Sequence, residues 1–222
     1  QRTHLSTSPS TPTPGRLNMR GALARDAQQA AGAIPNAQPW TSIQRRHNPN
    51  PPLRLGIAVD VSGSMTAATA PVAAAAWILA HATRLTDPAS RTATIAYDTA
   101  LTAITHPGRA PQHITQFRAT GSGHRLAEAI DALTHALDLD RPHAARLLVI
   151  ASDGLYTDDE TDAATARLAR LAAAGCPALH LAFAPGFAPS PLPGTAFAHI
   201  TDPTTTLDTI TQAATTVLVR TR

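Results

Sequence analysis

Three oxygen-bearing side chains follow one apolar segment of the sequence at alternate positions. Asp60, Ser62 and Ser64 come directly after the uncharged run at residues 55–59. A second, mainly apolar run at residues 146–151 ends in the same way, with Asp153 two residues beyond it. Carboxylate and hydroxyl oxygens are the ligands that hard divalent cations such as Mg²⁺ prefer. These residue types and their spacing therefore indicate a cation site.

The elements that must position these side chains are strands. Short runs of uncharged, largely β-favouring residues are typical of strands that are covered on both faces. The carboxyl ends of parallel strands meet at one edge of a sheet, where ligands of α/β proteins bind. We therefore expect Asp60 and Asp153 to lie close together.

From residue 53 onward, strand patterns alternate with helix patterns. We predict strands at residues 54–59, 92–97, 101–104, 112–115, 146–151 and 178–184, and a short edge strand at 199–201. We predict helices at residues 71–85, 126–137 and 204–218, and a further helix that ends at Ala174 and whose start has the capping-box spacing of Thr157 and Glu160. This alternation predicts an α/β fold, a doubly wound, Rossmann-like, mostly parallel sheet with helices on both faces.

The chain divides into three parts by composition. Residues 1–14 are rich in Ser, Thr and Pro, which predicts a disordered segment. Residues 15–52 contain an Ala-rich helix pattern at 19–33 and then a proline-rich arm at 35–52, which we expect to lie along the main domain. The α/β domain itself is predicted to span residues 53–222.

The basic residues exclude several functions. All 18 of them are Arg, so the chain has no P-loop lysine and no Schiff-base lysine. The Arg content is the only feature that suggests RNA binding, and the net charge of +3 is spread along the chain. The sequence contains neither a Gly-x-Ser-x-Gly elbow around Ser62 nor a His-Glu-x-x-His zinc motif. These absences argue against P-loop, Schiff-base, serine-hydrolase and zinc-protease chemistry.

The cysteine count and the absence of long apolar runs indicate the cellular compartment. A single cysteine, Cys176, excludes an internal disulfide and is typical of a reducing compartment. We find no apolar run of membrane-spanning length and no signal-peptide pattern, so we expect a cytoplasmic protein without a membrane partner.

The motif Asp60-x-Ser62-x-Ser64 after a buried strand, together with Asp153 after a later one, resembles the metal-ion-dependent adhesion site (MIDAS) of von Willebrand factor A (VWA) domains. This resemblance covers about residues 53–220. It implies a site for Mg²⁺, or for Mn²⁺, in which a carboxylate of a protein partner completes the coordination of the ion. Because this is a binding mechanism and not a catalytic one, the resemblance predicts a protein that is not an enzyme.

The second loop of the site differs from the family pattern. VWA domains usually have Gly-Gly-Thr before the helix that here begins near Leu126, and this alignment places His124 where the threonine belongs. Thr120 and Ser122 lie just upstream and could replace the threonine. His124 is either a direct ligand, which would favour Mn²⁺, Zn²⁺ or Fe²⁺ over Mg²⁺, or a residue that neighbours the site or caps the following helix, with water in the vacant coordination position.

Shorter stretches are similar to the intracellular, cobaltochelatase-type VWA subunits. They are Gly15-Arg16-Leu17, Arg45-Arg46-His47, Ser152-Asp153-Gly154 and Asp158-Asp159. The resemblance implies a VWA module that works with an AAA+ ATPase partner, and the absence of lysine agrees with an ATPase supplied by another chain. It leaves open a subunit of a cobalt or magnesium chelatase complex. An RNA-binding VWA domain is a third alternative.

Overall fold

The computed structural model describes residues 16–41, 51–109, 111–184, 188–200 and 212. The chain divides into two units, residues 1–50 and residues 51–222.

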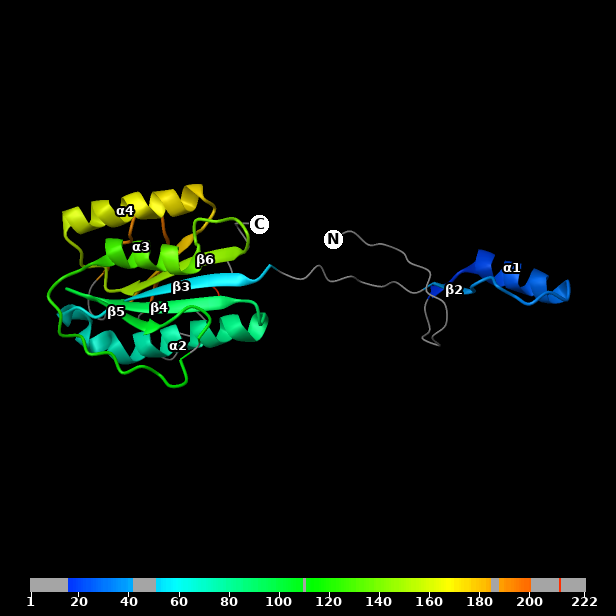
Figure 1. Cartoon of the computed structure of the whole chain (residues 1–222), viewed down its shortest axis with the longest axis horizontal. Helices are drawn as coiled ribbons and strands as arrows, with labels where there is room; N and C mark the ends of the chain where they lie inside the picture. The colour runs from blue at the N-terminus through cyan, green and yellow to red at the C-terminus, as the bar shows by residue number, and fades with distance from the viewer. Residues whose placement is uncertain (1–15, 42–50, 110, 185–187, 201–211, 213–222) are drawn as a thin grey trace. The chain divides into compact units, whose positions relative to one another are not determined.

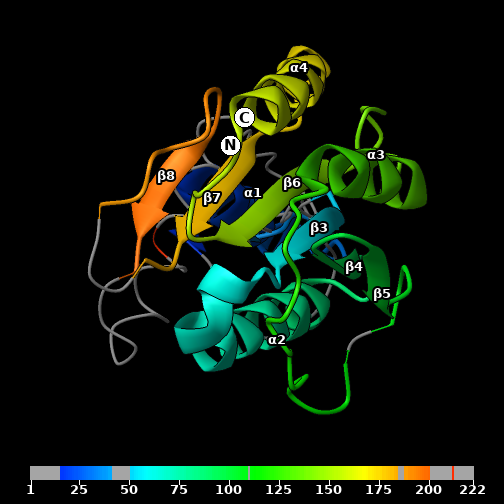
Figure 2. The same ribbon diagram turned by 90° about the vertical axis from the view of Figure 1, so that its left-hand side faces the viewer.

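The second unit is built on a sheet of six strands in the order β5-β4-β3-β6-β7-β8. The strands are β3 (Leu53–Asp60), β4 (Arg91–Tyr97), β5 (Leu101–Thr105), β6 (Ala145–Ser152), β7 (Ala178–Ala182) and β8 (Ala196–His199). All neighbouring pairs are parallel except β4 and β5, which are antiparallel. Figure 2 shows the sheet from β8 at one edge to β5 at the other. The predicted mostly parallel α/β sheet is confirmed.

Helices cover both faces of this sheet (Figure 1). A 3-10 helix, η1 (Gly63–Ala68), leads into α2 (Thr69–Thr86) on one face, while α3 (Leu126–Leu137) and α4 (Asp158–Ala173) lie on the other. Residues of β3 alternate between two cores, since Ile57 packs on the α2 side and Ala58 on the α3 side. A central strand buried on both faces therefore needs the continuous apolar run that the sequence shows.

Two strand predictions differ from the structure. Residues 112–115 form no strand, because the segment passes α2, where Nε2 of His81 lies 2.8 Å from the Pro111 carbonyl oxygen, and Ile114 is exposed. The edge strand β8 begins at Ala196 and ends at His199, earlier than predicted. Three predictions lie outside the described residues: the disordered segment at 1–14, the stretch Arg45-Arg46-His47, and the helix at 204–218 except for residue 212, which is helical.

One segment contradicts the expectation that the sequence has no apolar run long enough to cross a membrane. Gly63–Leu85 is long and apolar enough by composition, with a mean hydropathy of 1.3 over its best window. In the structure, Val72, Ala76 and Leu79 of this segment are buried against the sheet. The apolar side chains of this helix therefore form part of the hydrophobic core.

The first unit pairs two short strands around a helix. β1 (Arg16–Leu17) runs antiparallel to β2 (Trp40–Thr41), and α1 (Met19–Ala30) lies between them in sequence. Asn18 caps α1 by accepting a hydrogen bond from the Gly21 amide at 3.3 Å. The Gln28 amide oxygen accepts from the amides of Asn36 and Ala37 and so fastens the return segment to the helix. The predicted position of residues 35–52 along the main domain stays a prediction.

Candidate metal centre

Asp60 ends β3 with a carboxylate that is almost fully buried, at 2% exposure. Its Oδ1 accepts a hydrogen bond from the Ser62 amide at 2.8 Å, and its Oδ2 accepts one from the Ser152 hydroxyl at 3.0 Å. Each oxygen of Asp60 therefore accepts one hydrogen bond from the protein, which holds the carboxylate at the end of the strand and leaves each oxygen a second lone pair.

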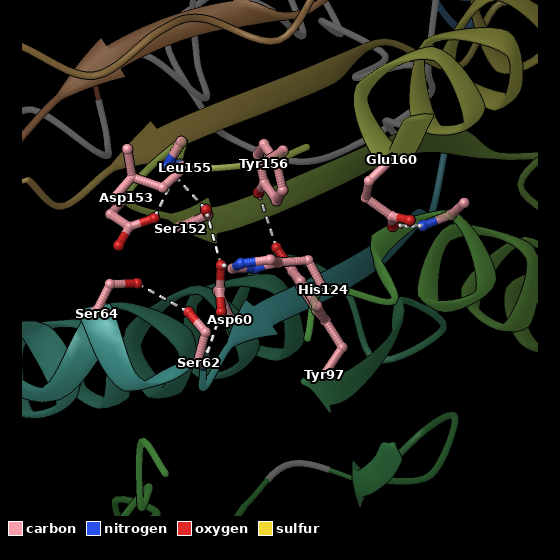
Figure 3. A network of polar contacts seen from close by, with 12 residues as sticks. Asp60, Ser62, Ser64, Tyr97, His124, Ser152, Asp153, Leu155, Tyr156 and Glu160 are labelled. Carbon is pink, nitrogen blue, oxygen red and sulfur yellow. Dashed lines mark hydrogen bonds and ion pairs between the residues drawn. The ribbon is translucent and has the colours of Figure 1, made fainter. Parts of the chain in front are cut away.

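The two serines of the first loop point to the same place. Ser62 precedes η1 and is buried, whereas Ser64 lies in the first turn of η1 and is exposed. Their Oγ atoms are 3.1 Å apart. Figure 3 shows both hydroxyls beside the Asp60 carboxylate. The pair extends from the buried acid to the surface of the domain.

Asp153 approaches from the neighbouring strand. β6 pairs with β3 so that Ala151 lies opposite Val59, and Asp153 follows at the same edge of the sheet as Asp60. Its Oδ1 accepts a hydrogen bond from the Leu155 amide at 3.0 Å. Its Oδ2 is buried and has no hydrogen-bond partner. Leaving a buried acceptor unpaired costs free energy, and a cation or its bound water would supply the missing contact. The donor set therefore fits a divalent cation.

The second loop is fastened to the first by its backbone. Ser62 and Gly121 form an isolated parallel bridge, and the Gly63 amide donates to the Gly121 carbonyl at 2.8 Å. A Cβ on Gly121 would overlap the Asp98 side chain, so this crossing requires glycine. The close approach of the two loops brings His124, three residues later, to the site.

His124 is the residue of the second loop that reaches Asp60. Its Nδ1 lies 3.6 Å from Oδ2 of Asp60, and this nitrogen is buried without a hydrogen-bond partner. The nearby Asp60 carboxylate raises the pKa of His124 above the usual histidine value, against an opposing effect of partial burial. Thr120 and Ser122, the other two candidates, are exposed. His124 does not cap α3, whose N-cap residue is Arg125.

Sequence reasoning missed three residues that hold this cluster. Ser152 binds Asp60 and also accepts a hydrogen bond from the Gly154 amide at 3.0 Å. The hydroxyls of Tyr97 and Tyr156 are 2.9 Å apart, and burial raises the pKa of both. The position of Ser152 at the end of the apolar run could have revealed its role. The Tyr97–Tyr156 contact spans 59 residues and leaves no local signal.

The cluster has few of the side chains that usually bind transition metals. Within the residues that the structure describes, no group of three or more His, Cys, Asp or Glu side chains could hold a metal ion by themselves. The structure brings together Asp60, Ser62, Ser64, Asp153 and His124, and it leaves Thr120 exposed. A cation here would therefore depend on hydroxyl oxygens from the serines.

The fold is that of a VWA domain, as the comparison with solved structures shows. The chain is similar to von Willebrand factor type A from Catenulispora acidiphila, with a TM-score of 0.57 and 17% identity over 80% of this chain and 44% of that one. It is also similar to proximal thread matrix protein 1 from the mussel byssus, with a TM-score of 0.57 and 10% identity over 74% of this chain and 47% of that one. This chain thus spans less than half the length of each.

A third similar structure is an aerotolerance-related membrane protein from Bacteroides fragilis, with a TM-score of 0.50 and 12% identity over 74% of this chain and 99% of that one. The model of the family described as VWA domain containing CoxE-like protein matches residues 2–209. The chain therefore belongs to this family. Among curated proteins, none matches the sequence.

Proposed function

We propose that this chain is a non-catalytic module that binds Mg²⁺ or Mn²⁺ through Asp60, Ser62, Ser64 and Asp153 and docks a protein partner through that ion. The observation that carries the proposal is Oδ2 of Asp153, which is buried and unpaired beside the two serine hydroxyls. A cation bound there would satisfy this oxygen.

The donor set also favours an external ligand. Ser62 and Ser64 are neutral, and both oxygens of Asp60 already accept hydrogen bonds from the protein. An ion held this way keeps a strong attraction for an anionic oxygen. Because Ser64 is exposed, a carboxylate on a partner protein could reach the ion.

The partner we propose is an AAA+ ATPase in the cytoplasm. The chain belongs to the CoxE-like family, and it has no lysine from which a P-loop could be built. Any ATP hydrolysis that accompanies its function is therefore not done by a P-loop within these 222 residues. A second candidate is a subunit of a cobalt or magnesium chelatase complex, which the cobaltochelatase-type motifs favour.

Metal binding is tested first with the isolated chain. We expect Mg²⁺ or Mn²⁺ at 100 times its dissociation constant to raise the free energy of unfolding by about 2.7 kcal/mol. Asp153→Asn keeps the oxygen that accepts from Leu155 and should abolish most of this gain. Ser64→Ala should weaken it, and Thr102→Ala, which removes an exposed hydroxyl from β5, should leave it unchanged. Equal titration curves for all four proteins would overturn the proposal.

Partner docking is tested by affinity capture with the full chain as bait. We expect an AAA+ ATPase to be retained in Mg²⁺ and lost after chelation, and Asp153→Asn to lose it in either buffer. Retention of a large chelatase subunit together with the ATPase would favour the second candidate. Retention that chelator does not change would contradict docking through the ion.

A further inference from the structure

The nitrogen of His124 that faces Asp60 forms an ion-pair contact with that carboxylate but has no hydrogen-bond partner in the protein. Nδ1 is buried and lies 3.6 Å from Oδ2 of Asp60, too far for a good hydrogen bond. Oδ2 of Asp60 already accepts a hydrogen bond from the Ser152 hydroxyl at 3.0 Å. A buried, unpaired imidazole nitrogen is costly unless a further group binds it. The unpaired oxygen of Asp153 lies in the same cluster.

The imidazole ring is held in this position by its neighbours. The Tyr156 ring meets it edge to face, with ring centroids 5.7 Å apart and planes at 79°. Tyr156 is in turn fixed by the hydroxyl of Tyr97, which is fully buried. Such support around a ligand keeps its orientation before a metal binds.

The start of α3 is fixed as well. Glu160, from the first turn of α4, accepts a hydrogen bond from the Ala127 amide at 2.9 Å. His124 lies three residues before this amide, so the backbone on its carboxyl side is tied to another helix. Two contacts therefore restrict the position of His124: the Tyr156 ring packs against its side chain, and the Glu160 carboxylate binds the backbone three residues after it.

A nitrogen donor changes which ions such a site prefers. Mg²⁺ takes oxygen ligands and is reluctant to lose its waters, whereas imidazole suits first-row transition metals. The serines and Asp153 supply only oxygen, so Nδ1 of His124 would be the one donor of the cluster that distinguishes the two classes of ion. We propose that His124 is a direct ligand that makes this site select a first-row transition-metal dication, such as Mn²⁺, over Mg²⁺.

This proposal rests on the cation site of the proposed function, and its test separates the two. Mn²⁺ and Mg²⁺ are titrated separately into the full chain and into His124→Thr, which supplies a hydroxyl instead of the nitrogen. We expect the ratio of Mn²⁺ to Mg²⁺ affinity to fall by about tenfold or more in the variant, since even supporting residues of metal sites change affinity by that much. His135→Ala, an exposed histidine on α3, is the matched control and should keep the ratio.

A spectroscopic measurement shows the ligand itself. Electron spin echo modulation of Mn²⁺ bound to the unaltered chain should report a directly bound nitrogen, and this signal should vanish in His124→Thr and in His124→Asn. Tight binding of both ions with no nitrogen signal and an unchanged ratio would overturn the role of His124 while keeping the cation site. Binding of neither ion would overturn both proposals.

Discussion

His180 is a buried histidine on β7, and its surroundings make the stability of the fold depend on pH. Burial lowers its pKa to about 4, and the charge of Asp60 opposes this shift only in part. Nδ1 of the ring accepts a hydrogen bond from the Leu192 amide at 3.4 Å. The proton of the neutral ring is therefore on Nε2, which is buried without a partner. The folded protein holds this ring neutral.

The pH dependence follows from the direction of that shift. Because the unfolded chain binds the proton near pH 6.5 and the folded chain only near pH 4, stability is complete above pH 6.5 and falls as the pH drops toward 4. The loss from this residue should approach about 3 kcal/mol. Urea unfolding at several pH values should show it, and His180→Leu should remove this part of the slope.

The control for this prediction is the exposed residue His135, whose substitution by alanine should leave the slope unchanged. Carboxylates also titrate below pH 5, so the comparison is the difference between the variants at each pH. Curves for the unaltered chain and His180→Leu that stay parallel from pH 7 to pH 4 would contradict the assignment.

Some residues of the site could be predicted from the sequence. Asp60 and Asp153 each follow a buried run, and parallel pairing of adjacent strands brings such positions to one edge. The support from Tyr97 and Tyr156 could not be predicted, because their contact depends on how a loop folds back over the sheet. The choice between His124 and Thr120 likewise depends on loop geometry, which Gly121 sets by its close approach to Asp98.

The helices α3 and α4 are joined by a hydrogen bond in which a residue of α4 caps the start of α3. Thr157 accepts a hydrogen bond from the Glu160 amide at 3.3 Å, so half of the predicted capping box is present. The Glu160 carboxylate instead accepts from the Ala127 amide, near the start of α3. Arg125, the N-cap residue of α3, makes no side-chain cap of its own. Glu160 therefore replaces it.

Removing this cap should destabilise the domain. We expect Glu160→Ala to lower the free energy of unfolding by about 1 to 2 kcal/mol, as the loss of a helix cap does. Glu160→Gln keeps an acceptor oxygen and should lose only the charge effect, about 0.3–1 kcal/mol. Asp159→Ala, an exposed neighbour in the same turn, tests the charge alone. Urea denaturation of the three variants would refute the role of the cap if Glu160→Ala and Asp159→Ala matched.

The sequence predicted the central strands better than the connections. β3 and β6 are buried on both faces along most of their length. Most of their residues are therefore apolar, and this continuous apolar run is easy to recognise in the sequence. Residues 112–115 contain a single apolar side chain, Ile114, and pair with no strand in the part of the chain that the structure describes. The segment is held by the contact of His81 with Pro111, which the local sequence does not encode.

In the molecule as a whole, the two units differ in what holds them together. The second unit has a core on each face of its sheet. In the first unit, none of residues 17–40 is buried, and Leu23, Ile34 and Trp40 are more than half exposed. A helix of the length of α1 is marginal in water without tertiary packing. The first unit therefore gains little free energy from burial of its own apolar side chains.

The two tryptophans allow this difference to be measured, because each unit contains one. Trp40 lies on β2, and Trp77 lies on α2, where its ring stacks on His81 with centroids 4.1 Å apart. We expect emission from Trp77, recorded in Trp40→Phe, to change in one cooperative urea transition as the core is lost. Emission from Trp40, recorded in Trp77→Phe, should already be red-shifted in buffer and should change gradually at lower urea.

Since Trp77→Phe alters a core helix, its circular dichroism must first match that of the unaltered chain. Coincident, equally steep transitions for both tryptophans would mean that the first unit unfolds together with the second.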